Sequence, residues 1–350
     1  MNIKGTFYYL GLFCFPITFL SLFNILFSSY FNYFLNIDSY IATLFISLFF
    51  GLFFLLIFRK SDKRINFYEQ IVLIVLIYII TALFISIPYY LSNYQITFIN
   101  SLFEAVSGIT GTGFSIFNNI KYLDPTLILW RSSSQWIGGL YFLIFLILFF
   151  SNSQFRYKLN SLVFTSDKSL SHEGNISKIA LKIFFLYSAL TILIFILLSM
   201  SNVRLFNSFN FSMTLISSGG FLPTNSLTQI IKTNIQEVVL IFAFMISLLN
   251  IFFIFNLFSI RDFIKEHYED IALLFLTTAI TIVLFFSLQN LDLIKTLIVV
   301  LSSIGNSGIG MSDVSNNFSL FLLFLTIIGG SVISNTSGIK FIRIYILLKV

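Results

Sequence analysis

The stretch SLFEAVSGITGTGF, residues 101–114, decides how the rest of the chain is interpreted. It begins as a short amphipathic helix and then becomes a run of Gly and Thr, which helices do not favour. Long apolar segments lie on both sides of it, where a soluble protein would need only a turn. A helix that enters a membrane halfway and returns as an extended, glycine-bearing segment gives this pattern. Such a segment can direct backbone carbonyls at a dehydrated cation.

The composition indicates a membrane protein. The 350 residues are 57% hydrophobic and 10% charged, whereas soluble domains carry about 25% charge. Apolar runs of about 20 residues recur, each long enough to cross a hydrocarbon core of about 30 Å. The single Cys14 excludes a disulfide framework, and the net charge of +6 bears on topology rather than on nucleic-acid binding. We therefore expect an all-α polytopic membrane protein.

Eight crossings are predicted, at residues 7–30, 39–58, 70–91, 127–150, 179–200, 235–258, 269–288 and 319–346. The first is interpreted as a retained helix, with a signal peptide as the alternative. Most Lys and Arg residues fall in the connections 59–69, 151–178 and 259–268 or near the two termini. The positive-inside rule then places both termini on the cytoplasmic side. Only these basic residues remain outside: Lys121, Arg131, Arg204, Lys232 and Lys295.

Three outer connections are too apolar for solvated loops. Each begins with a helix-like segment, at 102–109, 205–216 or 293–304, and then breaks at glycine. The breaks align with Gly113, Gly220 and Gly308 in register, each followed by a bulky apolar residue. An isolated glycine would more simply be a helix cap or a packing contact. Three in register instead favour an ion filter, because glycine lets successive carbonyls turn toward one axis.

We call residues 110–113, 218–220 and 306–308 the glycine segments. The predicted ion-binding residues are Thr110, Gly111, Thr112, Gly113, Ser218, Gly219, Gly220, Asn306, Ser307 and Gly308. The chain thus contains three copies of helix, half-helix with glycine segment, and helix. We predict a helix pair at 1–64 and pore repeats at 65–158, 159–262 and 263–350. The second repeat includes a cytoplasmic linker, and the third has an interrupted second helix.

At this point a family resemblance becomes specific. FEAVSGITGTG at 103–113 is similar to the first pore loop of the Trk/Ktr/HKT superfamily of K⁺ transporters, and most of all to its TrkH branch. WRSSSQWIGG at 130–139 resembles the start of the following helix in that family. SGGF at 218–221 resembles the second filter, and the stretch from Gly329 to Arg343 resembles the interrupted helix of the third repeat. The extra helix pair at the N-terminus is also TrkH-like.

The resemblance implies a pore of four such units around a pseudo-fourfold axis, with K⁺ bound only by filter carbonyls and no cofactor in this chain. It implies an intramembrane gate at about 329–340. The predicted gate residues are Gly329, Gly330, Ser334, Asn335, Thr336, Gly338 and Lys340. It further implies a bacterial inner-membrane location, a cytosolic nucleotide-binding regulatory subunit (TrkA-like) and a homodimer.

Two departures from the family pattern stand out. The gate segment reads SVISNTS at 331–337, which is poorer in glycine than is usual for the family. The sequence also ends at Val350, directly after the third repeat, so a fourth half-helix and filter are absent from it. Our expectation is an incomplete sequence or truncated product. A separately encoded fourth quarter or completion by another subunit are the alternatives.

Several polar residues allow two interpretations. Arg131 is either an interfacial anchor or the partner of Glu104 that braces the pore helix, since an intramembrane carboxylate needs a partner. Lys340 has either a gating role or an anchoring role with Arg343. His172 and Glu173 in the linker, and His267 at the inner edge, are interpreted as solvated residues, because no further ligands surround them at metal-site spacing.

The sequence therefore predicts K⁺ uptake through a carbonyl filter, and no enzyme activity. A Na⁺-permeable or non-selective relative of the same fold is the alternative, as is a non-conducting fragment. A membrane enzyme or assembly scaffold would need intramembrane His or carboxylate clusters, and the predicted spans offer almost none beyond Glu104. No nucleophile–base arrangement or P-loop pattern is present in the sequence.

Overall fold

The computed structural model describes residues 3–62, 65–151, 176–253, 267–287, 292–310 and 318–349. Within these ranges all regular elements are helices, which confirms the all-α prediction. Five helical segments are long and apolar enough to cross a membrane. They are α1 (Ile3–Phe31), α2 (Ile37–Ile57), α3 (Phe67–Tyr90), the Ala180–Met200 part of α7 (Ile176–Met200), and α12 (Tyr268–Ser287). Their outer faces expose large apolar side chains such as Phe45 and Phe286, as lipid contact requires.

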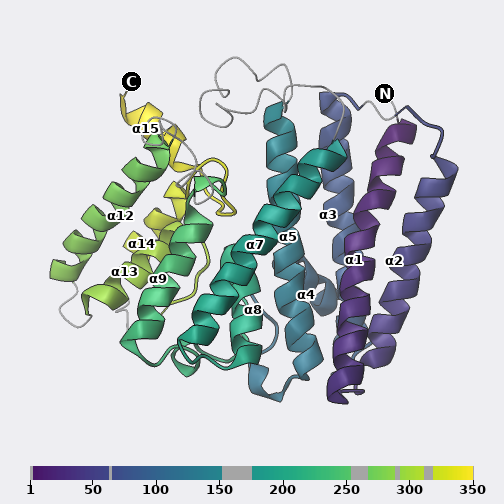
Figure 1. Ribbon diagram of the computed structural model, residues 1–350, viewed down its shortest axis with the longest axis horizontal. Coiled ribbons are helices and arrows are strands. Elements are labelled where there is room, and N and C mark those ends of the chain that lie inside the picture. The colour runs from purple at the N-terminus through teal and green to yellow at the C-terminus, as the bar shows by residue number, and fades with distance from the viewer. Residues whose placement is uncertain are drawn as a thin grey trace. The chain divides into compact units, whose positions relative to one another are not determined.

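The chain divides into two compact units, Met1–Thr110 with Phe114–Gly138, and Gly111–Gly113 with Gly139–Val350. In the first unit α1, α2 and α3 pack side by side (Figure 1). Their close packing depends on small residues, because a Cβ built on Gly11 of α1 would lie 3.0 Å from the carbonyl oxygen of Gly51 in α2. The short helix α4 (Phe98–Ile109) packs on α3, and the 3-10 turn η1 (Ile120–Tyr122) precedes α5 (Pro125–Ser151).

The second unit repeats the same element order twice. The short helix α8 (Leu205–Ile216) follows α7, and the turn η4 (Leu227–Gln229) leads to α9 (Asn234–Leu248). The short helix α13 (Leu293–Ile304) follows α12 and packs against it, against α9 and against α14 (Ser319–Ile328), as Figure 1 shows. The last helix is α15 (Phe341–Lys349), so residues 329–340 interrupt the helical path between α14 and α15. We call these residues the 329–340 loop.

The predicted crossing at 235–258 is not one continuous helix, and its residues 254–258 lie outside the described part of the chain. Helix α9 stops at Leu248, and Leu249 has an extended conformation, with φ −80° and ψ 168°. The backbone there bonds to the 329–340 loop instead of continuing the helix. The Ser331 N–H donates to the Leu248 carbonyl at 3.0 Å, and the Ile251 N–H donates to the Ile333 carbonyl at 2.9 Å. Hydrogen bonds to a segment distant in sequence therefore end this helix.

Candidate functional site

The three glycine segments follow short helices of identical length. Helices α4, α8 and α13 each have 12 residues. The second residue after each helix has a positive φ, namely 70° at Gly111, 53° at Ser218 and 58° at Asn306. Gly113 and Gly308 follow two residues later and have φ values of 81° and 62°. The alignment made from sequence thus corresponds to the same backbone position relative to each helix end.

The second and third of these helices end in the same hydrogen-bonded motif. After α8, the Ser218 N–H donates to the Leu215 carbonyl at 3.1 Å and the Gly219 N–H to the Thr214 carbonyl at 2.9 Å. After α13, Asn306 and Ser307 donate to the carbonyls of Ser303 and Ser302, both at 3.1 Å. This is the Schellman arrangement, which turns the chain sharply out of a helix through a left-handed residue. The same local hydrogen bonds therefore set the path of the chain after α8 and after α13.

In the second unit, Gly220 lies against both Gly113 and Ser307, which come from the other two segments. A Cβ built on Gly113 would lie 2.6 Å from the Cα of Gly220, and a Cβ built on Gly220 would lie 2.8 Å from the carbonyl oxygen of Ser307. A real side chain does not fit at these distances, so both positions require glycine. The space around Gly308 is open, because nothing lies within 4 Å of a Cβ built there. Its positive φ, rather than crowding, is what favours glycine at this position.

Hydroxyl groups inside the short helices form hydrogen bonds with the glycine segments or with the residues directly after them. The Ser107 hydroxyl donates to the Phe114 carbonyl at 2.6 Å, and the Thr214 hydroxyl donates to the Phe221 carbonyl at 2.9 Å. In the third copy the Ser302 hydroxyl is 3.0 Å from the Ser307 hydroxyl. Our sequence reasoning missed these residues. The available signal was a Ser or Thr six positions before each aligned glycine.

Each glycine segment also follows the C-terminal end of a helix. The carbonyls there carry the partial negative charge of the helix dipole, which favours a cation and disfavours an anion. In the described part of the chain, no group of three or more His, Cys, Asp or Glu residues could hold a metal ion. The ligands that these segments offer are therefore backbone carbonyls and neutral side chains. Such oxygens suit a monovalent cation.

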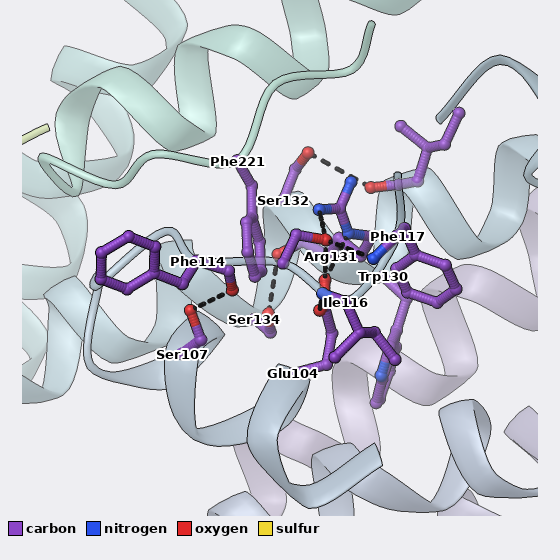
Figure 2. A network of polar contacts seen from close by, with 12 residues as sticks. Glu104, Ser107, Phe114, Ile116, Phe117, Trp130, Arg131, Ser132, Ser134 and Phe221 are labelled. Atoms are coloured by element: carbon purple, nitrogen blue, oxygen red, sulfur yellow. Dashed lines mark hydrogen bonds and ion pairs between the residues drawn. The ribbon is translucent and has the colours of Figure 1, made fainter. Parts of the chain in front are cut away.

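In the first unit, Glu104 and Arg131 form a fully buried ion pair (Figure 2). The Arg131 Nε donates to Glu104 Oε1 at 2.8 Å. Glu104 also accepts from the Ser115 hydroxyl at 3.0 Å and from the Ile116 N–H at 2.9 Å. The Arg131 guanidinium donates to the Ser115 hydroxyl at 2.9 Å and lies 5.5 Å from the centre of the Phe117 ring. Arg131 therefore contacts α4 and the segment that follows it, as the bracing interpretation requires.

The 329–340 loop contains the predicted gate residues, and glycines determine its path. Gly329 and Gly338 have φ values of 69° and 87°, and their backbones touch. The Gly330 N–H donates to the Thr336 hydroxyl at 2.8 Å, and Ser334 and Thr336 share a hydrogen bond at 2.8 Å. Lys340 is buried and donates back into this loop. The loop is thus compactly folded and is stabilised by hydrogen bonds between its own residues.

Asn335 connects this loop to the second short helix. Its side-chain amide donates to the carbonyl of Ile216, the last residue of α8, at 2.6 Å. Ile216 precedes the glycine segment at 218–220 by two residues. A displacement of the loop would therefore break a hydrogen bond directly beside that segment.

The interpretation of His267 as a solvated residue is wrong. His267 and Asp270 are 3% and 2% exposed, and the His267 Nδ1 lies 2.8 Å from Asp270 Oδ2. Asp270 Oδ1 also accepts from the Asn250 N–H at 2.9 Å and from the Ser331 hydroxyl at 2.6 Å. The distant residues that surround the pair could not be identified from its immediate sequence. His172 and Glu173 lie outside the described residues.

Apolar spanning helices, together with half-length helices that end in glycine segments, define a polytopic membrane protein of the re-entrant loop type. The family model of TrkH, described as a cation transport protein, matches residues 36–319. The chain therefore belongs to the TrkH family of cation transport proteins. The family consists of transporters, which confirms the expectation that this chain is not an enzyme.

Curated relatives and a solved structure agree with this assignment. An uncharacterized cation transporter of Methanocaldococcus jannaschii is 28% identical over 82% of this chain and 60% of its own length. The Trk system potassium uptake protein TrkG of Escherichia coli is 24% identical over 83% of this chain and 63% of its own length. The chain thus spans less than two thirds of these relatives. The crystal structure of the potassium transporter TrkH from Vibrio parahaemolyticus has the same fold, with a TM-score of 0.82 over 99% of this chain and 75% of that one, at 19% identity.

Proposed function

We propose that this chain forms most of a K⁺ uptake pathway, in which backbone carbonyls of the glycine segments replace the water around the ion. The observation that carries the proposal is the close contact of Gly220 with both Gly113 and Ser307 in the second unit. Three segments that approach this closely present many carbonyls within a small volume. The names of several relatives, which are potassium uptake proteins, support K⁺ as the ion.

The buried pair of Glu104 and Arg131 supports the first segment in this proposal. Glu104 belongs to α4, and its partners Ser115 and Ile116 follow Gly113 closely in the chain. The pair therefore fixes the half-helix to the segment that leaves the filter. The 329–340 loop is the proposed gate, and the bond from Asn335 to Ile216 is the proposed connection between gate and filter. We retain the repeat boundaries at 65–158, 159–262 and 263–350 as part of the proposal.

The same proposal places the chain in a bacterial inner membrane with both termini in the cytoplasm. The excess of basic residues in the connections assigned to that side supports this orientation. We further propose a cytosolic nucleotide-binding regulatory subunit as partner, and a homodimer. These two assignments rest on the family resemblance alone.

Substitution of Gly113 tests the filter proposal. In bacteria that lack K⁺ uptake and whose growth at low K⁺ is restored by a completed version of this chain, Gly113→Ala should abolish that growth, because its Cβ would overlap the Gly220 backbone. Gly310→Ala is the matched control, since a Cβ there meets nothing within 4 Å and Gly310 does not have a positive φ. Normal growth with Gly113→Ala would contradict the proposal. Equal uptake of ²²Na⁺ and ⁸⁶Rb⁺ would favour the non-selective alternative.

A further inference from the structure

Lys340 has an unusual backbone conformation for its residue type. Its φ is 76°, in the left-handed region that residues with a Cβ rarely adopt. Only 8% of the residue is exposed, although it carries a charge. Strained residues that persist in a structure are held there by their surroundings. The contacts of the Lys340 side chain must therefore hold the residue in this conformation.

The ammonium lies among four neutral oxygen atoms of the 329–340 loop. The Lys340 Nζ donates to the Thr336 carbonyl at 2.5 Å and to the Ser334 carbonyl at 3.1 Å. The hydroxyls of Ser334 and Thr336 lie at 3.2 Å and 3.4 Å from the same nitrogen. The Phe142 ring of α5 lies over it, with its centre 5.6 Å from Nζ. We call the four oxygen atoms the oxygen cage.

The chemistry of this cage is that of a monovalent cation site. Two of its atoms are carbonyl oxygens, which can only accept hydrogen bonds, so they favour the charged ammonium over a neutral amine. The aromatic face of Phe142 attracts a cation as well. Carbonyl and hydroxyl oxygens of this kind replace the water shell of K⁺ in protein pores.

We propose that the oxygen cage is a binding site for a dehydrated monovalent cation of the size of K⁺, and that Lys340 occupies it with its own ammonium. The side chain then acts as a tethered cation that keeps the 329–340 loop folded. A free ion can take the cage only when the ammonium leaves it. A role of this exchange in gating rests on the proposed function. The occupancy of the cage by the Lys340 ammonium does not.

The test compares two variants of the full chain in detergent. Lys340→Ala empties the cage, whereas Lys340→Met keeps the side chain's bulk without its charge. Exchanging choline chloride for KCl well above the dissociation constant should raise Tm by a few degrees more in Lys340→Ala than in the unsubstituted chain, because only the variant has an empty cage for the ion. Crystals soaked in Tl⁺ should show an anomalous peak between Ser334 and Thr336 in this variant. The unsubstituted chain and Lys340→Met should show no peak there.

Two results would overturn the proposal. One is a Lys340→Ala chain that has no Tl⁺ peak at the cage under conditions that give a peak at the glycine segments. The other is failure of Lys340→Ala to fold in KCl, since K⁺ should replace the missing ammonium. Absence of Tl⁺ at the glycine segments alone would count against the proposed filter and leave the cage standing. The two proposals therefore fail separately.

Discussion

At the scale of single residues, the cost of burying charge explains the polar contacts of α4 and α5. Glu104 and Arg131 are 0% and 1% exposed, and each needs a partner of opposite charge in surroundings that exclude water. The sequence could name them as possible partners because a carboxylate within the membrane needs a partner of opposite charge. It could not choose between bracing and anchoring, because that depends on where α5 lies beside α4.

Removing one member of this pair should destabilise the chain strongly. Glu104→Gln leaves the buried Arg131 without its counter-charge and should lower the free energy of unfolding by about 3–5 kcal/mol. The double variant Glu104→Gln with Arg131→Met should recover part of that loss. Asp292→Asn is the control, because Asp292 is exposed and its 3.9 Å pair with Lys295 is a surface pair. Thermal unfolding in detergent measures all three, and equal losses in Glu104→Gln and the control would contradict the role of the pair.

At the scale of elements, the first turn of α12 connects two segments that lie far from it in the sequence. Asp270 accepts hydrogen bonds from Asn250 after α9, from Ser331 in the 329–340 loop, and from His267 beside it. The neighbouring Glu269 accepts from the Val332 N–H at 3.0 Å. The start of one helix thus fixes the end of another and the break in a third.

Loss of the Asp270 carboxylate should therefore affect more than its own helix. Asp270→Ala leaves three donors without their acceptor and should cost about 3 kcal/mol or more, since bonds to charged groups are worth about 1.5–3 kcal/mol each. Asp38→Ala is the matched control, because Asp38 is also in the first turn of a helix but is exposed. Loss of the Asp38 carboxylate should remove only its interaction with the dipole of α2, which lowers the free energy of unfolding by about 0.3–1 kcal/mol. Similar unfolding temperatures for the two variants would show that the Asp270 contacts contribute little.

At the scale of the whole molecule, the membrane sets which ends of the helices carry charge. Lys and Arg cluster in the connections that we assign to the cytoplasm, and the glycine segments follow the opposite ends of the spanning helices. Lys60 and Lys121 are both exposed, and the predicted topology places them on opposite sides of the membrane.

Cysteine labelling tests this orientation. In a Cys14→Ala background, Lys121→Cys should react with a membrane-impermeant maleimide added to intact spheroplasts, whereas Lys60→Cys should react only after lysis. Mass spectrometry of the purified chain gives the extent of labelling at each position. Reaction of Lys60→Cys but not Lys121→Cys in intact spheroplasts would show that the topology is the reverse of the one assigned. Equal reaction of both variants would contradict the assignment.

The sequence by itself determined the helices, the three short helices and the register of their glycines. These features depend on local physics: apolar runs as long as a bilayer is thick, and glycine where the chain must leave a helix through a positive φ. The prediction that the short segments at 205–216 and 293–304 are helical agrees with α8 and α13 at both ends. Ser218 and Asn306 show that a local turn can also use residues other than glycine.

Only the tertiary structure decided which polar groups meet. Helix α9 ends early because its last carbonyl bonds to Ser331, and His267 is buried because Asp270 and Phe253 lie against it. The ammonium of Lys340 points into its own loop, toward oxygens four and six residues earlier in the chain. Each of these contacts satisfies a buried polar group that cannot reach water, so its partner is chosen by folding and not by neighbouring residues.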